Sequence, residues 1–279
     1  MNYVKLNNGK NIPVFGYGVY CIPKDECEKC VLEALKVGYR HIDAAQIYQN
    51  EEEVGNAISK CGIPREELFI TSKIWVCNYG YKKAKESIDR SLKRLKTEYI
   101  DLMLIHRPYA NYKGAWKALE EGVKEGKIRS IGLSNFNVKE TESILAMATI
   151  KPVVNQIECH PYGQQKEMRA YLKEKDIAVE AWFPIGHGDK QLLTDPVLSE
   201  IAQKYGKTVA QVILRWHVQV ENITFPKSVK PERIKENFDI FDFELSQDDM
   251  AKIEALDKGK YCPTPPKWLD TIISKFKRA

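Results

Sequence analysis

The sequence predicts an α/β protein with the fold of a (β/α)8 barrel. Short apolar runs alternate with amphipathic segments from about residue 15 to residue 256, and eight of these runs have the length of strands. No Gly-rich phosphate loop follows an early strand, which disfavours the alternative of a doubly wound open sheet. A chain of 279 residues suffices for one barrel, so we expect a single domain over residues 1–279.

The elements follow in order along the chain. The N-terminal segment predicts a β-hairpin with its turn at residues 7–10, placed to cap the bottom of the barrel. The predicted barrel strands are residues 15–19, 39–43, 68–74, 99–106, 129–134, 153–158, 178–183 and 223–228. Helical spacing of apolar residues predicts helices between them, as at 27–35, 84–95 and 209–216. Ser246 begins a capping signal for a last helix, and the apolar face of residues 197–205 predicts an extra helix.

The composition is that of an ordinary globular protein with no nucleic-acid or membrane partner. The formal net charge is +5, and no basic block marks a nucleic-acid face. The N-terminus does not resemble a signal peptide, and no run of about 18 apolar residues could span a membrane. Seven cysteines form no disulfide framework, so we expect reduced thiols and a cytoplasmic location.

Two cysteine patterns bear on metal or redox chemistry. Cys27 and Cys30 form a C-x-x-C pair, but both fall on the apolar face of a predicted helix, which favours core packing. Cys159 and His160 have no second pair at ligand spacing. We therefore predict no metal site.

Polar side chains stand at the ends of three successive predicted strands. The second strand ends at Asp43, the third at Lys73 and the fourth at His106, and they are about one βαβ unit apart in sequence. Active sites of such barrels lie where the strands end, at the carboxyl face. We therefore expect these three side chains side by side on one rim, with Tyr48 leaning over them from the loop after the second strand.

Together these four residue types suit proton delivery to a developing alkoxide. A tyrosine is a weak acid at neutral pH, and a nearby ammonium makes its phenol a better proton donor. A buried lysine needs a carboxylate to remain charged, which Asp43 would supply to Lys73. His106 could orient a carbonyl oxygen. Two alternatives are a purely structural Asp43–Lys73 ion pair and a Schiff-base lysine as in barrel aldolases.

The chain resembles the aldo-keto reductase family over essentially its whole length. The motifs GYRHIDAAQIY, TSKIW, LIHRP, GLSNF, NQIECHP and PKSVKPERIKEN stand in the family's order, and the resemblance is to its microbial branch of diketogluconate reductases and prostaglandin F synthase-like enzymes. It implies the barrel, reversible NADPH-dependent carbonyl reduction, and a catalytic tetrad of Asp43, Tyr48, Lys73 and His106. A glutamate in place of the histidine would instead suggest reduction of carbon–carbon double bonds.

The resemblance also implies the residues that hold NADPH/NADP+. Ser134, Asn135 and Gln156 would bind the nicotinamide carboxamide, and Trp182 would stack on the ring where the family commonly has tyrosine. The clamp for the adenosine 2′-phosphate and the adenine contacts match Lys227, Ser228, Val229, Arg233, Glu236 and Asn237. Further cofactor contacts fall on Gly18, Val19, Tyr20, Phe183 and Pro184. The loop at 184–193, ahead of the extra helix, would close over the cofactor.

The substrate pocket contains one departure from the family pattern. Many members have tryptophan after the tetrad histidine, and this chain has Arg107. Either Arg107 lines the pocket and favours substrates with a carboxylate or phosphate, or it turns away and pairs with an acidic residue. The remaining pocket wall is expected from Tyr20, Ile47, Trp75, Tyr109 and Trp268.

Two functions from different classes follow. The first is an NADPH-dependent reductase of a small carbonyl compound, with sugars, keto acids, methylglyoxal-like aldehydes and quinones all open as substrates. We expect it to be a monomer, with a weak homo-oligomer as the alternative. The second is an NADPH-binding regulatory barrel with slow turnover, since some barrels of the family serve as channel subunits. An intact tetrad fits both, and turnover on a generic aldehyde separates them.

Overall fold

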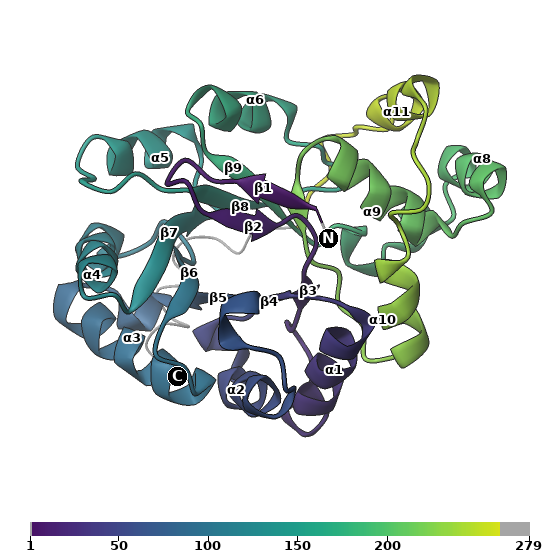
Figure 1. Ribbon diagram of the computed structural model, residues 1–279. Coiled ribbons are helices and arrows are strands. Elements are labelled where there is room, and N and C mark those ends of the chain that lie inside the picture. The colour runs from purple at the N-terminus through teal and green to yellow at the C-terminus, as the bar shows by residue number, and fades with distance from the viewer. Residues whose placement is uncertain (1, 263–279) are drawn as a thin grey trace.

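The computed structural model describes residues 2–262, and within them it confirms the predicted barrel (Figure 1). Eight parallel strands are hydrogen-bonded in the order β10-β9-β8-β7-β6-β5-β4-β3, which is the order of the chain read backwards. Each neighbour pair is therefore consecutive in sequence, as expected when a helix connects every strand to the next.

The sheet closes on itself between its first and last strands. Phe15 forms a parallel bridge with Thr224, whose N–H donates to the carbonyl of Val14 at 3.0 Å and whose carbonyl accepts from Gly16 N–H at 2.8 Å. Gly18 N–H donates to the carbonyl of Pro226 at 3.1 Å. These bonds satisfy both edges, so the strands form a barrel rather than an open sheet.

The strand positions agree with the prediction, and several strands are shorter than expected. They are β3 (Tyr17–Gly18), β4 (His41–Asp43), β5 (Phe69–Ile74), β6 (Ile100–Ile105), β7 (Ile128–Ser134), β8 (Val154–Glu158), β9 (Ala178–Trp182) and β10 (Ile223–Thr224). The prediction of a strand through residue 228 was wrong for residues 225–228. Pro226 there has no N–H to donate to a sheet neighbour, which ends the ladder.

Helices surround the barrel, and the predicted extra helix is present. The helices of the described residues are α1 (Lys24–Val37), α2 (Glu51–Lys60), α3 (Tyr81–Leu95), α4 (Tyr112–Lys124), α5 (Val138–Leu145), α6 (Lys166–Glu174), α7 (Lys190–Leu193), α8 (Pro196–Tyr205), α9 (Val209–Gln219), α10 (Pro231–Phe238) and α11 (Gln247–Glu254). The extra helix is α8, and α11 begins at the capping box of Ser246 and Asp249. None of these helices is long and apolar enough to cross a membrane.

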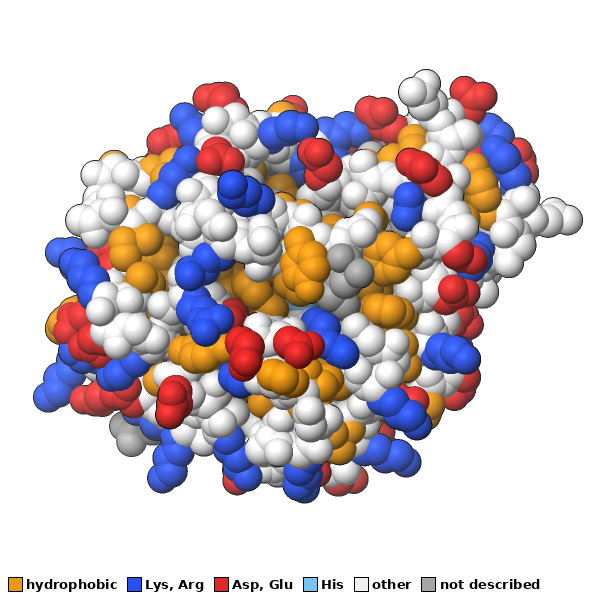
Figure 2. All heavy atoms as spheres, viewed as in Figure 1, with side chains coloured by type: hydrophobic (Ala, Val, Ile, Leu, Met, Phe, Trp, Pro, Cys, Tyr) orange, Lys and Arg blue, Asp and Glu red, His pale blue; other side chains and the backbone are white. Residues whose placement is uncertain are grey.

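The N-terminal hairpin caps one end of the barrel, as predicted. Its strands are β1 (Tyr3–Lys5) and β2 (Asn11–Pro13), and Asn7 in its turn donates to the carbonyls of Pro152 and Asp176, just before β8 and β9. Figure 1 looks onto this end, and Figure 2 shows that acidic and basic side chains are interspersed on it. The strands end on the opposite face, where the candidate site lies.

The pair Cys27 and Cys30 is consistent with core packing rather than redox chemistry. Cys27 and Cys30 are buried on the inner face of α1, and all seven cysteines of the chain are free thiols. Burial raises the pKa of the Cys27 thiol to about 12. The thiol therefore stays protonated and unreactive at neutral pH.

Candidate active site

A buried lysine forms the centre of the site. Lys73 comes from β5 and is completely buried, and its ammonium lies 2.9 and 2.8 Å from the two carboxylate oxygens of Asp43 on β4. It also donates to the carbonyl of Ala44 at 2.9 Å and to the hydroxyl of Tyr48 at 3.4 Å. Burial opposes its charge, but Asp43 and Tyr48 outweigh burial and hold the pKa of Lys73 above its ordinary value. The lysine is therefore a fixed cation beneath the phenol.

Tyr48 is placed by a short helical turn directly after β4. The turn spans Gln46–Tyr48 and ends at Gln49 in the left-handed conformation. The buried side chain of Gln46 anchors the turn, because it donates to Ser91 and accepts from the backbone N–H of Trp75 at 3.0 Å. Burial raises the pKa of Tyr48 to about 12, and the ammonium of Lys73 opposes that rise. The phenol is therefore protonated at neutral pH and has a proton to donate.

His106 follows β6 and faces the phenol from the other side. Its ring centroid lies 6.0 Å from that of Tyr48 and 5.0 Å from that of Trp75. Burial, with the charges of Lys73 and Arg107, holds the pKa of His106 well below its ordinary value. The imidazole is therefore neutral and can donate a hydrogen bond to a carbonyl oxygen without carrying charge.

The structure thus brings all four predicted residues of the tetrad together at the carboxyl end of the strands. Asp43 and Lys73 stand on the neighbouring strands β4 and β5, His106 directly follows the next strand β6, and Tyr48 lies over the lysine. An oxygen between the phenol and the imidazole would meet two hydrogen-bond donors, with a cation behind one of them. This arrangement can stabilise and protonate a developing alkoxide.

The predicted nicotinamide contacts also lie on this rim. The Trp182 indole donates to the side-chain oxygen of Asn135 at 3.0 Å, and the Asn135 amide nitrogen donates to the carbonyl of His106 and to Ser134 Oγ. The ring of Phe183 lies 4.7 Å from that of Trp182. These contacts join β6, β7 and β9 around one spot beside the tetrad. Pro184 follows in the loop, where its carbonyl contacts the ring of His217 at 3.1 Å.

Sequence reasoning missed Glu180, a carboxylic acid inside the barrel. It lies on β9 and is completely buried. The side-chain nitrogen of Gln156 donates to Asp43 Oδ1 and to Glu180 Oε2, each at 3.0 Å. Both amide protons of Gln156 are thereby used, which leaves its oxygen as an acceptor for the predicted carboxamide. A charged residue two positions before Trp182 in an apolar strand was the available signal, because alternate residues of a strand share a face.

Burial, with the charge of Asp43, raises the pKa of Glu180 to about 8. Its unfolded pKa is about 4.3, so the stability that comes with the protonated acid is complete below about pH 4.3 and is lost as pH rises through about 8. Glu180→Gln mimics the protonated acid. We therefore expect the variant to be more stable than wild type at pH 9 and to unfold at a higher temperature. The difference in free energy of unfolding should be several kcal/mol at pH 9, at about 1.4 kcal/mol per pKa unit, and should disappear toward pH 4.5.

Thermal unfolding of both proteins across this pH range measures this difference. Glu98→Gln, at an exposed glutamate, is the matched control, and its stability should not differ from wild type in this pH-dependent way. A difference in stability between Glu180→Gln and wild type that stays constant across this pH range would mean that Glu180 is ionised over the whole range.

The predicted phosphate clamp presents two cations to solvent. Lys227 and Arg233 are exposed and form no ion pair with the described residues, and α10 begins between them. Ser228 is buried and holds the segment, because its carbonyl accepts from Tyr17 and its hydroxyl accepts from Lys230 N–H. Two free cations beside a helix N-terminus fit a phosphate group.

The other predicted cofactor residues lie near this clamp or on β3. Val229 is half-buried, and Asn237 is buried on α10. Glu236 already accepts a hydrogen bond from Thr208 at 2.9 Å. Gly18 lies against the segment that directly follows β10, since a Cβ there would be 2.9 Å from the carbonyl of Phe225. Val19 follows it in the core.

Ring contacts place two of the predicted substrate residues, Tyr20 and Trp75, beside the tetrad. The Tyr20 ring lies 5.0 Å from that of Tyr48 and is 44% exposed, so it covers the phenol from solvent. Trp75 is buried against His106, and Ile47, Arg107 and Tyr109 are half-buried. Trp268 lies outside the described residues.

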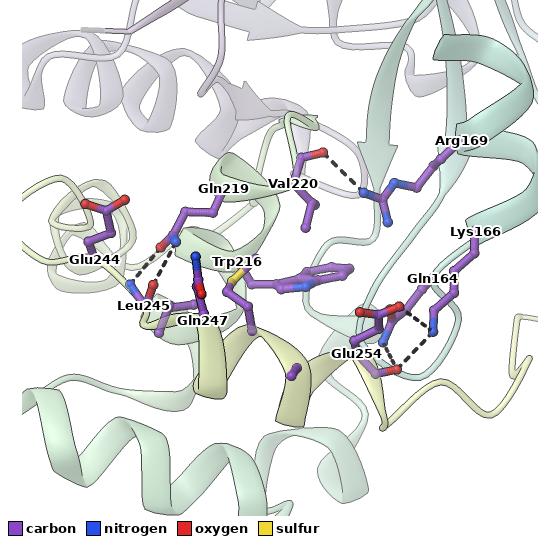
Figure 3. Close-up of a pocket in the computed structure, with 12 residues that line it drawn as sticks. Gln164, Lys166, Arg169, Trp216, Gln219, Val220, Glu244, Leu245, Gln247 and Glu254 are labelled. Atoms are coloured by element: carbon purple, nitrogen blue, oxygen red, sulfur yellow. Dashed lines mark hydrogen bonds and ion pairs between the residues drawn. The ribbon is translucent and has the colours of Figure 1, made fainter. Parts of the chain in front are cut away.

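A separate cavity of about 500 Å³ lies between α6, α9 and α11 (Figure 3). Trp216 forms part of its wall, and both of its basic side chains already have partners. Arg169 donates to the carbonyl of Val220 at 3.2 Å, and Lys166 lies 3.2 Å from the carboxylate of Glu254. None of the predicted site residues lines it, so we assign it no function.

Comparison with known proteins identifies similar chains over nearly the whole length. The model of the aldo/keto reductase family matches residues 15–258. The glyoxal reductase of Bacillus subtilis is 52% identical over 269 residues, which cover 95% of this chain and 97% of that protein. A crystal structure of an aldo/keto reductase from Brucella melitensis is 49% identical with a TM-score of 0.89, covering 92% of this chain and 99% of that one. The Bombyx mori aldo-keto reductase, solved in complex with NADP, is 34% identical with a TM-score of 0.90, covering 96% and 97%.

Proposed function

Because the chain belongs to the aldo/keto reductase family, we propose that it reduces aldehydes and ketones to alcohols with NADPH, and that Tyr48 supplies the proton. One observation carries the assignment of the proton donor. The hydroxyl of Tyr48 lies 3.4 Å from the ammonium of a completely buried lysine, which Asp43 holds with both carboxylate oxygens. A phenol in this position gives up its proton to an alkoxide while the cation stabilises the phenolate that remains.

Each residue of the tetrad then has a distinct task. When bound, NADPH supplies a hydride to the carbonyl carbon. His106 and Tyr48 hold the carbonyl oxygen by hydrogen bonds, and Tyr48 donates its proton to that oxygen as charge develops on it. Lys73 stabilises the phenolate, and Asp43 keeps Lys73 charged and in place. Tyr20 and Trp75 exclude water from this spot.

The cofactor fits the described residues at both of its ends. The oxygen of Gln156 is free to accept from a carboxamide, since Asp43 and Glu180 occupy its nitrogen. At the other end, the exposed Lys227 and Arg233 suit the extra phosphate that distinguishes NADPH from NADH.

Loss of this phosphate contact should weaken the preference for NADPH over NADH. We expect Arg233→Met to raise the KM for NADPH by roughly 10- to 100-fold, since charge-assisted hydrogen bonds are worth about 1.5–3 kcal/mol. The KM for NADH should change little, because NADH carries no such phosphate. Initial rates with both cofactors measure this, with the exposed Lys235→Met on the same helix as control. Equal losses with both cofactors would place Arg233 outside the phosphate site.

The function itself is tested by NADPH consumption with a panel of small aldehydes and ketones. Glyoxal belongs in the panel because a similar protein is named for it. Turnover that depends on the carbonyl compound supports the reductase. Tight binding of NADPH without turnover on any member of the panel would favour the alternative of an NADPH-binding regulatory barrel.

A further inference from the structure

We propose that Arg107 forms an anion subsite beside the reaction centre and that this subsite selects carbonyl substrates carrying a carboxylate. The inference rests on the proposed function, because it places the reacting carbonyl between Tyr48 and His106. Arg107 follows His106 directly in the chain, and its charge helps to lower the pKa of His106, so the guanidinium lies near the group that would hold the carbonyl oxygen. A carboxylate attached to the same small molecule would therefore lie within its reach.

The charge of Arg107 is not neutralised by any described residue. No ion pair forms between Arg107 and an acid within residues 2–262. The acids of this rim have other partners: Glu158 lies 3.4 Å from His160 and accepts from Cys262 N–H, and Asp189 pairs with Lys260. A half-buried cation without a partner attracts an anionic ligand, and the surrounding low dielectric strengthens that attraction.

Two buried donors next to His106 also lack an acceptor. The Nε of Arg107 and the Nε1 of Trp75 are both buried and have no hydrogen-bond partner. Both groups can only donate, so what they lack is an acceptor. Trp75 is 6% exposed, and its ring lies 5.0 Å from that of His106. Buried polar groups are nearly always paired, and two orphan donors beside a reaction centre point to an oxygen-rich ligand.

The backbone of Arg107 is rigidly held. The buried Tyr79 hydroxyl donates to the carbonyl of Arg107 at 2.8 Å and accepts from its N–H at 2.9 Å. On the preceding residue, the carbonyl of His106 accepts from Asn135 at 3.0 Å. The guanidinium thus starts from a fixed point, which lowers the entropy cost of binding. Its planar donor fork matches a carboxylate, whose two oxygens can accept in parallel.

Matched pairs of acid and ester measure this preference directly. Succinic semialdehyde and 4-carboxybenzaldehyde are each compared with their methyl esters by kcat/KM for wild type, Arg107→Met and Arg107→Lys. We expect wild type to prefer the acids by roughly 10- to 100-fold, the range of a charge-assisted hydrogen bond. Arg107→Met should abolish the preference, and Arg107→Lys should keep part of it. Arg90→Met, at an exposed arginine on α3, is the control and should leave the ratio at its wild-type value.

Several outcomes would overturn the proposal. The subsite proposal fails if wild type prefers the esters, or if the ratio of kcat/KM for acid over ester is unchanged in Arg107→Met. Neither result would contradict carbonyl reduction itself. Failure to reduce either member of any pair removes the proposed function instead. Glyceraldehyde and glyceraldehyde phosphate are compared in the same way. If the phosphate raises kcat/KM by a larger factor than the change from ester to acid does, the subsite belongs to phosphate esters. If Arg107→Met does not fold, wild type still decides, because benzoate should inhibit ester reduction more strongly than benzamide.

Discussion

Tyr48→Phe is expected to lower kcat by roughly 10²- to 10⁴-fold, the usual contribution of general-acid catalysis. The change removes only the hydroxyl that lies 3.4 Å from Lys73, and the aromatic ring that packs against Tyr20 and His106 remains. His106 is a poor replacement as an acid, because it is neutral and its pKa lies well below the ordinary value. Steady-state and single-turnover rates of NADPH consumption measure the loss.

The binding of NADPH provides the internal control. The residues proposed to hold the nicotinamide carboxamide and the 2′-phosphate lie on or directly after β7 to β10 and on α10, so the variant should bind NADPH with nearly wild-type affinity, as titration by fluorescence can show. Tyr112→Phe, at a half-buried tyrosine on α4, is a matched variant that should keep the full rate. A kcat for Tyr48→Phe within a few-fold of wild type would assign proton transfer to another group.

The barrel and the residues of the tetrad could be predicted because they depend on local patterns that repeat. Each strand is an apolar run, and its last residue must lie at the carboxyl face once the strands are parallel. Asp43, Lys73 and His106 could therefore be placed on one rim from their spacing alone. The lengths of the strands were less predictable. β10 ends before Pro226, which accepts a hydrogen bond from Gly18 but has no N–H to donate in return.

The side chains that position the site could not be predicted in the same way. Tyr79 and Gln46 act through backbone groups that are distant in sequence, and no local pattern marks such a partner. The effect of burial on acidity was also misjudged. The ammonium of Lys73 does favour the phenolate, but burial is the larger influence and the pKa of Tyr48 rises to about 12. Both effects depend on how completely the barrel covers these groups, which emerges only from the packed structure.

Lys73→Met is expected to damage stability and catalysis together, and the two losses can be separated. Removing the ammonium leaves the carboxylate of Asp43 buried without its counter-ion, which typically costs about 3–5 kcal/mol. It also removes the cation that stabilises the Tyr48 phenolate, so kcat should fall by at least 10²-fold even at temperatures where the variant is folded. Thermal unfolding and kcat, measured on the same preparations, give the two quantities.

The double variant Asp43→Asn with Lys73→Met decides between a structural and a catalytic lysine. It removes both charges, so no unpaired ion remains and a large part of the lost stability should return. The activity should not return, because the phenolate of Tyr48 would still lack a cation within reach. If the pair were only structural, activity would recover together with the unfolding temperature. Stability that recovers without activity would show that this barrel keeps a buried charge for its chemistry, at the expense of the fold.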